Sequence, residues 1–245
     1  MLIHPIAVLR SPLKQKFGAP RQPGLVDLEG QITFHEPYGD PAAFEGIEQF
    51  THLWLVWQFH AIKPNPDFVP RVRPPRLGGN LKVGVFATRS MFRPNPLGLS
   101  VVKLKKVELI GSHVTLWVQG ADLIDGTPIF DIKPYLPYSD AVAQARAPGF
   151  DAPNNRDVTY QPSALDQLAE LGLLADQSLI SAVIAQDPRP AYRMGKPDDK
   201  RYTIRWKNSD IAFEASDRGF EVIAVSAVSG ETAPPKISKA LNSEP

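Results

Sequence analysis

The sequence predicts a mainly β protein, with a barrel-like N-terminal domain followed by a small α+β C-terminal domain. Before residue 160, short runs rich in β-branched and aromatic residues are separated by turn residues, and helical periodicity is almost absent. After residue 163 the spacing of apolar residues becomes helical and then returns to strand-like runs. The GxGxxG turn of a dinucleotide-binding Rossmann fold does not occur. We therefore expect a barrel or sandwich that is not Rossmann-like.

Six segments of the N-terminal domain have the composition of strands. The run from His113 to Gln119 alternates with a period of two, as a half-buried strand does. Gly111-Ser112 before it is typical of a hairpin turn. A short helical turn is expected at 46–52. The predicted strands are residues 5–10, 31–34, 53–59, 83–88, 100–110 and 114–122.

A stretch rich in Ala, Pro and Asn at 139–162 is interpreted as a linker to the C-terminal domain. Ser163 is expected to cap a first helix that ends at Gly172, and Asp176 to cap a second helix that stops at Asp187-Pro188. Strands at 202–206, 211–215 and 220–228 should follow, with a turn at 217–219. The predicted domain bounds are 1–138 for the barrel, 163–228 for the α+β domain and 229–245 for a flexible tail.

The absence of cysteine limits the kinds of site that the protein can form, and its apolar segments indicate its compartment. The chain has no cysteine, which excludes disulfides, thiolate metal sites and a cysteine nucleophile. The N-terminus lacks the basic start and apolar run of a signal peptide, and the longest apolar stretch, residues 53–57, is too short to cross a membrane. These features predict a cytoplasmic protein without a membrane segment.

Charge is distributed unevenly along the chain, although the net charge is only +1. The segment from Phe68 to Val107 contains no Asp or Glu. Its nine basic residues are Arg71, Arg73, Arg76, Lys82, Arg89, Arg93, Lys103, Lys105 and Lys106. This excess favours a phosphate-rich or carboxylate-bearing partner. The alternative is a solvated face that is balanced by acids elsewhere in the fold.

Three segments that contain arginine also carry Pro or Gly residues that stiffen or bend the backbone. The loop 17–24, FGAPRQPG, presents Arg21 and Gln22, which could bind a carboxylate or a base edge. The segment 71–80, RVRPPRLGGN, is extended but lacks the spacing of a P-loop. In 84–100, a strand runs into a turn that carries Arg89 and Arg93. The alternative for 17–24 is an ordinary proline-fixed turn. The alternative for 84–100 is a structural arginine pair that ties a turn to backbone carbonyls.

Two further segments combine acids with turn residues. In 120–135, a strand ends in Asp122 and Asp125 beside a Gly-Thr-Pro turn, where carboxylates could hold hydroxyls or an ammonium group. Asp125 could equally be a turn former, and the ligand spacing does not favour a metal. In 186–193, QDPRPAYR, a stiff loop offers Asp187, Arg189 and Tyr192 as a base, an anion clamp and a stacking ring. The alternative is a helix stop with surface charges.

Together these segments resemble a known family. PRQPG, RPPRLGGN, GVFATRSMFRPNPLGLS, DLIDGTPIFDIKPYLPY and QDPRPAYR look like the tRNA N6-threonylcarbamoyladenosine methyltransferases of the TrmO type. The resemblance covers roughly residues 3–225 in family order. It implies a β-barrel methyltransferase, a homodimer, S-adenosylmethionine as cofactor and a tRNA anticodon loop as partner. The methylated adenosine would lie 3′ of the anticodon of a threonine-type tRNA and already carry a threonylcarbamoyl group.

The resemblance also implies which residues contact the cofactor. Carried over onto this sequence, they are Pro20, Arg21, Gln22, Phe59, His60, Arg89, Leu99, Asp122, Leu123, Ile124, Asp125, Gly126 and Thr127. No metal is expected.

For the reaction itself, residues outside the cofactor segments are candidates. Asp187 or Tyr192 could act as a base toward the weakly nucleophilic, urea-like N6. Arg189, Arg93 or Arg73 could clamp the threonyl carboxylate. Arg193 and the segment that contains Arg71, Arg73 and Arg76 could contact phosphates. Two rival functions are a non-enzymatic RNA-binding barrel and an S-adenosylmethionine enzyme with another small substrate; cofactor binding and tRNA dependence would discriminate among them.

Overall fold

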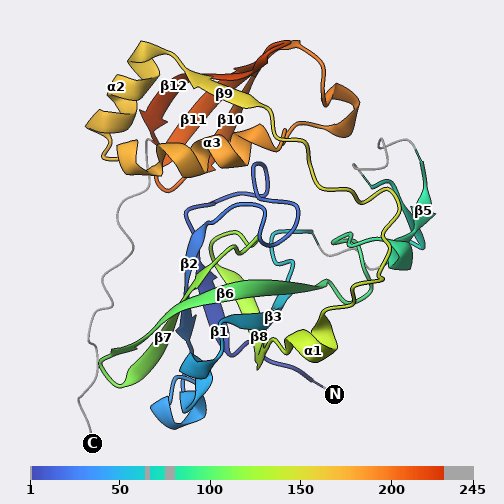
Figure 1. The fold of residues 1–245 in the computed structure, drawn as a ribbon, viewed down its shortest axis with the longest axis vertical. Helices are drawn as coiled ribbons and strands as arrows, with labels where there is room; N and C mark the ends of the chain where they lie inside the picture. Colours follow the sequence, from blue (N-terminus) through green and yellow to red (C-terminus); the bar gives the residue numbers. More distant parts are fainter. Residues whose placement is uncertain (1, 64–66, 75–80, 229–245) are drawn as a thin grey trace, which may run out of the picture.

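The protein is described here from a computed structural model that covers residues 2–63, 67–74 and 81–228. Two bodies lie one above the other, a β-barrel and a smaller α+β domain (Figure 1). This architecture confirms the mainly β, non-Rossmann fold that the sequence predicts. No helix in the described ranges is long and apolar enough to cross a membrane.

Six strands close into the barrel in the order β1-β2-β7-β6-β3-β8. All neighbouring pairs for which a register is defined are antiparallel. In β3 every second side chain is buried, with Leu53, Leu55 and Trp57 inside, because alternate residues of a strand face opposite sides. The strands are β1 Ala7–Arg10, β2 Glu29–Phe34, β3 His52–Gln58, β6 Leu97–Ile110, β7 His113–Gln119 and β8 Thr127–Pro134.

β8 was not among the predicted strands, although it closes the barrel between β1 and β3. Its sequence, TPIFDIKP, contains two prolines and a charged pair, which hide the alternation of a half-buried strand. A short helix, α1 Pro137–Asp140, follows it. Between β2 and β3, 3₁₀ turns at Pro41–Phe44 and Ile47–Gln49 include the helical turn that was expected at 46–52.

The predicted strand at 83–88 is wrong over most of its length. Only Val83–Gly84, β5, is extended, and it pairs with β4, Arg71–Val72. A 3₁₀ turn at Val85–Ala87 follows. The Thr88 hydroxyl donates to the Val85 carbonyl at 2.7 Å and Arg93 donates to the Thr88 carbonyl at 2.7 Å, so side chains satisfy the groups that a strand would pair.

The C-terminal domain is a four-stranded sheet in the order β10-β11-β12-β9 with two helices. The strands are β9 Asp157–Tyr160, β10 Asp198–Trp206, β11 Ser209–Ala215 and β12 Gly219–Ala227, and the helices are α2 Pro162–Glu170 and α3 Gln177–Ala185. β9 pairs in parallel with β12 and lies inside the stretch interpreted as a linker, so that stretch is not wholly irregular. A 3₁₀ turn at Leu174–Asp176 precedes α3, and another at Ala191–Arg193 follows it.

The predicted helix caps are only partly correct. Gln161, not Ser163, precedes α2, and Pro162 occupies the first turn. Asp176 does stand before α3, but its carboxylate accepts from the Trp206 indole at 3.0 Å and pairs with Lys207 at 2.6 Å instead of capping the helix. Gly172 follows α2 with a φ of 68°, as a C-terminal glycine should.

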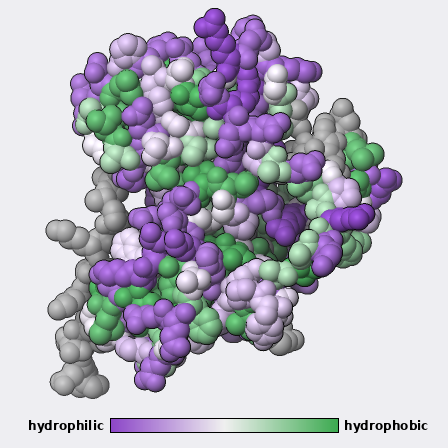
Figure 2. All heavy atoms as spheres, in the orientation of Figure 1, coloured by the Kyte–Doolittle hydropathy of each residue, from purple (hydrophilic) through white to green (hydrophobic). Residues whose placement is uncertain are grey.

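The connection between β1 and β2 belongs to the C-terminal core. Leu13, Val26 and Leu28 are buried in one hydrophobic cluster with Trp206, Ile204 and the helices. Leu13 forms an isolated bridge with Trp206, and the Lys207 amide donates to the Pro12 carbonyl at 2.7 Å. The loop at 11–28 is therefore an N-terminal segment held by the C-terminal domain, and Figure 2 shows hydrophobic side chains where the two domains meet.

Candidate active site

The loop that carries Pro20, Arg21 and Gln22 lies between the two domains. Arg21 Nη2 donates to the backbone carbonyls of Asp187 at 3.1 Å and Arg189 at 3.3 Å. Its Nη1 also contacts the Met194 sulfur at 3.6 Å. Pro20 is buried. Arg21 therefore points to the C-terminal domain, and its neighbour Gln22 is free to face the other way.

Gln22 meets the second arginine segment. Its side-chain oxygen accepts a hydrogen bond from Arg89 Nη1. Arg89 is exposed and follows the 3₁₀ turn after β5. Arg93, in contrast, uses its guanidinium to hold the carbonyls of Thr88 at 2.7 Å and Val85 at 3.5 Å. Of this pair, Arg93 braces the turn and Arg89 reaches the neighbouring loop.

A hydrogen-bonded chain runs from the barrel wall to Asp122. The Trp57 indole donates to the Ser100 hydroxyl at 3.0 Å, and Ser100 donates to Asp122 Oδ1 at 2.6 Å. Burial raises the pKa of Asp122 to about 6, while the Ser100 hydrogen bond and the charge of Arg89 oppose that rise. Asp122 is thus a partly buried carboxyl whose pKa is raised well above its ordinary value and that lies within the field of Arg89.

The rest of the turn at 122–127 is fixed by hydrogen bonds to β1 and the β1–β2 loop and by one bond within the turn. Asp125 accepts from the Ser11 amide at 3.0 Å and pairs with Lys14 at 2.9 Å, so its carboxylate faces the β1–β2 loop. The Gly126 amide donates to the Leu9 carbonyl at 2.8 Å, and the Thr127 hydroxyl donates to the Ile124 carbonyl at 2.6 Å. Leu123 is buried. Of the two carboxylates in this segment, Asp122 is the one whose pKa the charge of Arg89 lowers, whereas Asp125 pairs with Lys14.

Apolar and aromatic groups border the same region. The Phe59 ring packs edge-on against Trp57 with 4.4 Å between centroids. His60 is exposed, and a Cβ built on Gly126 would lie 4.0 Å from its Nε2. Leu99 on β6 is 54% exposed. The structure thus brings Gln22, Arg89 and Asp122 together beside this aromatic edge.

The loop after α3 contains a buried ion cluster. Arg189 Nε and Nη2 donate to the two carboxylate oxygens of Asp187 at 2.7 and 2.8 Å. Burial alone would raise the pKa of Asp187, but the hydrogen bonds from Arg189 and from the Gly195 amide lower it below its ordinary value. Arg189 is 1% exposed. This geometry argues against Asp187 as a base and against Arg189 as a clamp, because each already satisfies the other.

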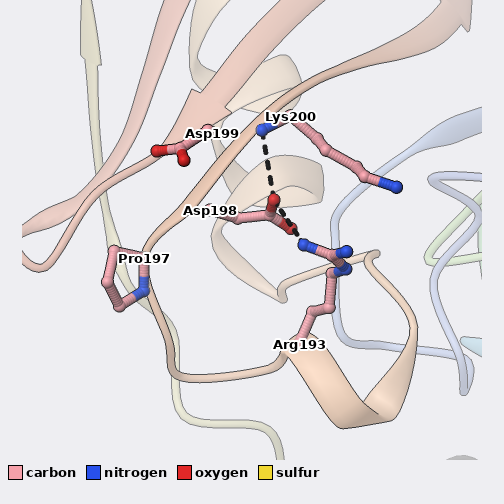
Figure 3. A pocket seen from close by; sticks show the side chains of 5 residues that line it. All are labelled: Arg193, Pro197, Asp198, Asp199 and Lys200. Atoms are coloured by element: carbon pink, nitrogen blue, oxygen red, sulfur yellow. Dashed lines mark hydrogen bonds and ion pairs between the residues drawn. The ribbon is translucent and has the colours of Figure 1, made fainter.

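Tyr192 and Arg193 lie on the outer side of that loop. Tyr192 is 66% exposed. Arg193 pairs with Asp198 at 2.5 Å beside an open hollow of about 480 Å³, and Lys200 donates its amide to the same carboxylate at 3.1 Å (Figure 3). Arg193 retains partial exposure, with 30% of its side chain open. These two residues can meet a large partner, which Asp187 and Arg189 cannot.

The remaining basic candidates lie near β4. Arg71 is exposed and donates to the Lys82 carbonyl at 2.9 Å, and Arg73 is exposed. Arg76 and the Gly78-Gly79 pair fall outside the described residues. Among the residues that the structure describes, no group of three or more His, Asp or Glu side chains could hold a metal.

Two features of the site were missed from the sequence. Ser100 and Trp57 were not singled out, although they support Asp122. A signal existed in Gly98, which lies opposite Trp57 in the β3–β6 register; a Cβ there would come within 2.2 Å of the indole. A glycine inside a strand marks such a close approach. The role of the 11–28 loop in the C-terminal core had no comparable local signal.

Comparison with known proteins assigns the chain to a family. The model of the tRNA-methyltransferase O N-terminal domain matches residues 8–141, and that of the TrmO C-terminal domain matches residues 153–228. A protein of Escherichia coli named tRNA (adenine(37)-N6)-methyltransferase is 43% identical over 225 residues, which cover 90% of this chain and 95% of that protein.

A shorter protein of Methanothermobacter thermautotrophicus, named "Probable S-adenosyl-L-methionine-binding protein", is 39% identical over 140 residues, 57% of this chain and 93% of its own. The crystal structure of TrmO from Pseudomonas aeruginosa superposes with a TM-score of 0.72 at 35% identity, covering 93% of this chain and 99% of that one. The chain therefore belongs to the tRNA-methyltransferase O family.

Proposed function

We propose that the chain transfers a methyl group from S-adenosylmethionine to N6 of a tRNA adenosine that lies 3′ of the anticodon and already carries a threonylcarbamoyl group. As a member of its family, the chain is a tRNA (adenine-N6)-methyltransferase. The observation that supports the cofactor part of the proposal is the meeting of Gln22, Arg89 and Asp122 beside Phe59 and Trp57, and the substrate part rests on the family resemblance. A non-enzymatic RNA-binding barrel, the rival function, does not explain why these three residues lie together.

The residues of the site fit the groups of S-adenosylmethionine. Arg89 offers a cation for the carboxylate of the cofactor, and Asp122 offers an anion for its ammonium or sulfonium. Phe59 and Leu99 provide apolar surface for the adenine ring. When bound, S-adenosylmethionine supplies an activated methyl group. The residues that we propose to hold it are Pro20, Gln22, Phe59, His60, Arg89, Leu99 and the 122–127 turn, with Arg21 acting through its backbone.

The chain's part in the reaction is mainly to align the two substrates and exclude water. N6 of the modified base is urea-like, so removing its proton or stabilising the developing charge should help. Tyr192 remains the candidate for this role, because its side chain is exposed whereas Asp187 is bound to Arg189. Arg73, which is exposed, is the remaining candidate to bind the threonyl carboxylate.

Binding of tRNA should depend on exposed cations. Arg71 and Arg193 are the proposed phosphate contacts, because Arg71 is exposed and Arg193 is partly exposed, and the acid-free stretch 68–107 adds to the local positive charge. Neutralising phosphates releases counterions, so the affinity for tRNA should fall steeply as salt rises. The bases of an anticodon loop can be splayed out and stacked on side chains such as Tyr192.

We also propose that the protein is a cytoplasmic homodimer. Large apolar side chains near the site are exposed in the single chain, with Phe86 at 71%, Phe92 at 55% and Leu99 at 54%. A second copy of the chain would cover such exposed apolar surface. Light scattering on the purified protein tests this proposal; a monomeric mass at micromolar concentration would contradict it.

The decisive experiment is mass spectrometry of nucleosides after incubating the protein and S-adenosylmethionine with threonine-accepting tRNA, with and without the threonylcarbamoyl group. A gain of one methyl on the modified nucleoside alone is the expected result. Methylation of unmodified adenosine would refute the substrate requirement. Cofactor binding without any transfer to tRNA would favour an S-adenosylmethionine enzyme with another small substrate.

A further inference from the structure

The loop between α3 and β10 is organised around a side chain that reaches no solvent. The side chain of Arg189 is 0% exposed. It donates twice to Asp187, and its Nη1 donates to the Lys196 carbonyl at 2.9 Å. Asp198 lies 3.9 Å from the same nitrogen. Arg189 thus ties the beginning of the loop to its end.

A contact with the Phe220 ring and an unusual backbone conformation at Asp187 also characterise this loop. The Arg189 guanidinium carbon lies 5.2 Å from the centroid of the Phe220 ring. Asp187 has a φ of 52°, a left-handed conformation that is uncommon without glycine, and its carboxylate also accepts from the Gly195 amide at 3.2 Å. The ion pair and this second bond hold a backbone shape that the sequence alone would not favour.

This shape presents two backbone carbonyls to the other domain. The carbonyls of Asp187 and Arg189 both accept from Arg21 Nη2, at 3.1 and 3.3 Å. The next residue, Gln22, accepts from Arg89. A continuous set of contacts therefore joins the buried cluster of the C-terminal domain to the arginine that we assign to the cofactor.

We infer that Arg189 is a positioning residue that acts through Arg21 to hold the Pro20–Gln22 segment in its place for S-adenosylmethionine. The inference rests on the proposed function, in which that segment and Arg89 contact the cofactor. Arg189 touches neither the cofactor nor the tRNA. It shapes the loop carbonyls that bind Arg21, and Arg21 fixes Gln22 beside Arg89.

Arg156 provides a matched control in the same domain. Its guanidinium carbon also lies 5.2 Å from the Phe220 centroid, and its Nη2 donates to the carbonyls of Ser216 at 2.7 Å and Asp217 at 3.1 Å. It thus braces the β11–β12 turn as Arg189 braces its loop. The Arg156 side chain thus contacts the β11–β12 turn and Phe220 of its own domain. Lysine at either position loses the two-pronged geometry of arginine.

The test compares Arg189→Lys with Arg156→Lys in the full chain, by titration calorimetry with S-adenosylmethionine and by thermal unfolding. Both variants should lower the unfolding temperature. Arg189→Lys should weaken cofactor binding by about tenfold, which is about 1.4 kcal/mol of binding free energy, and should raise KM for the cofactor with kcat nearly unchanged. Arg156→Lys should leave both constants within about twofold of the parent. Equal changes in affinity in the two variants would overturn the inference.

A double-substitution cycle tests the route through Arg21. In an Arg21→Lys background the link to the two carbonyls is already weakened, so adding Arg189→Lys should change the affinity little; additive effects would overturn the route. If Arg189→Lys does not fold, Asp187→Asn replaces it in both comparisons, because asparagine has nearly the same shape as the aspartate that binds Arg189. Failure of the parent protein to bind S-adenosylmethionine would refute the proposed function itself, which is a separate outcome.

Discussion

Replacing Asp122 by asparagine should make the protein more stable at neutral pH while weakening the proposed cofactor site. Asp122 is partly buried and accepts from Ser100 at 2.6 Å, and burial raises its pKa to about 6. An ionised carboxylate in this position loses hydration that one hydrogen bond and the field of Arg89 do not fully restore. Asparagine has nearly the same shape, keeps an oxygen for the Ser100 hydroxyl and carries no charge.

The size of the effect follows from the pKa. The ordinary value for this carboxyl is 3.8 and the value in the folded protein is about 6, so at ~1.36 kcal/mol per pKa unit the ionised form costs up to about 3 kcal/mol. A pKa raised by folding means that the folded state holds the proton more tightly than the unfolded state. The free energy of unfolding of the parent therefore falls as pH rises from about 4 through 6, and the loss levels off above that.

Urea denaturation of both proteins at several pH values measures this difference. The stability advantage of Asp122→Asn should grow by about 2 kcal/mol between roughly pH 4 and roughly pH 7.5, because the other carboxyls titrate alike in both proteins. A difference that stays constant with pH would refute the reasoning. Calorimetry on the same samples should show weaker binding of S-adenosylmethionine at neutral pH, because asparagine lacks the negative charge that we propose to face the ammonium or sulfonium of the cofactor. The gain in stability and the loss of binding would then have the same cause, since a residue that serves a site often costs stability.

Four other substitutions probe the site and its supports. Arg89→Ala should abolish measurable cofactor binding in calorimetry; an unchanged affinity would mean that the pocket is wrongly placed. Gly98→Ala should destabilise the barrel by about 1–3 kcal/mol, because its Cβ would lie 2.2 Å from the Trp57 indole, and an unchanged urea midpoint would contradict that clash. Leu13→Ala should cost about 2–5 kcal/mol and increase amide exchange in β10, whereas exchange changes confined to the barrel would contradict its place in the C-terminal core. Tyr192→Phe should lower kcat about 100-fold or more if the hydroxyl moves a proton, with cofactor affinity as the control; an unchanged kcat would remove Tyr192 as the base.

The fold could be predicted from the sequence where local pattern and tertiary structure agree. β7 and the hairpin at Gly111-Ser112 follow from alternation and a turn glycine, whose φ is 66°. β8 could not be predicted, because prolines at Pro128 and Pro134 break the pattern while barrel closure supplies its partners on both sides. Barrel closure depends on the whole sheet and therefore cannot be predicted from any short stretch of sequence.

The site was predictable in part for the same reason. Loops with fixed backbones identify Gln22 and Arg89 as residues that face outward. For Asp187 and Arg189, the spacing of two residues is equally typical of a surface turn and of a buried pair. Which one forms depends on Phe220 and Asp198, which come later in the chain and are brought beneath the loop only by the sheet. Sequence reasoning therefore placed a loop after the second predicted helix, as the structure does, but could not assign its side chains to the inside or the outside.

Residues of both domains support the candidate site, and the part that each domain supports depends on where its loops are packed. A closed barrel leaves no edge strand, so its functional groups must come from its connections and its wall. Asp122 lies in the connection between β7 and β8, and Ser100 and Trp57 of the barrel wall hold it in place. The 11–28 loop instead has its apolar residues in the C-terminal core, with Leu13 against Trp206. The apolar residues that support the two sides of the candidate site thus belong to different cores. Hydrogen bonds from the Gly24 amide to the Gly120 carbonyl at 2.8 Å and from the Ser11 amide to Asp125 at 3.0 Å also tie the 11–28 loop to the barrel domain, so both domains fix Gln22 beside Arg89.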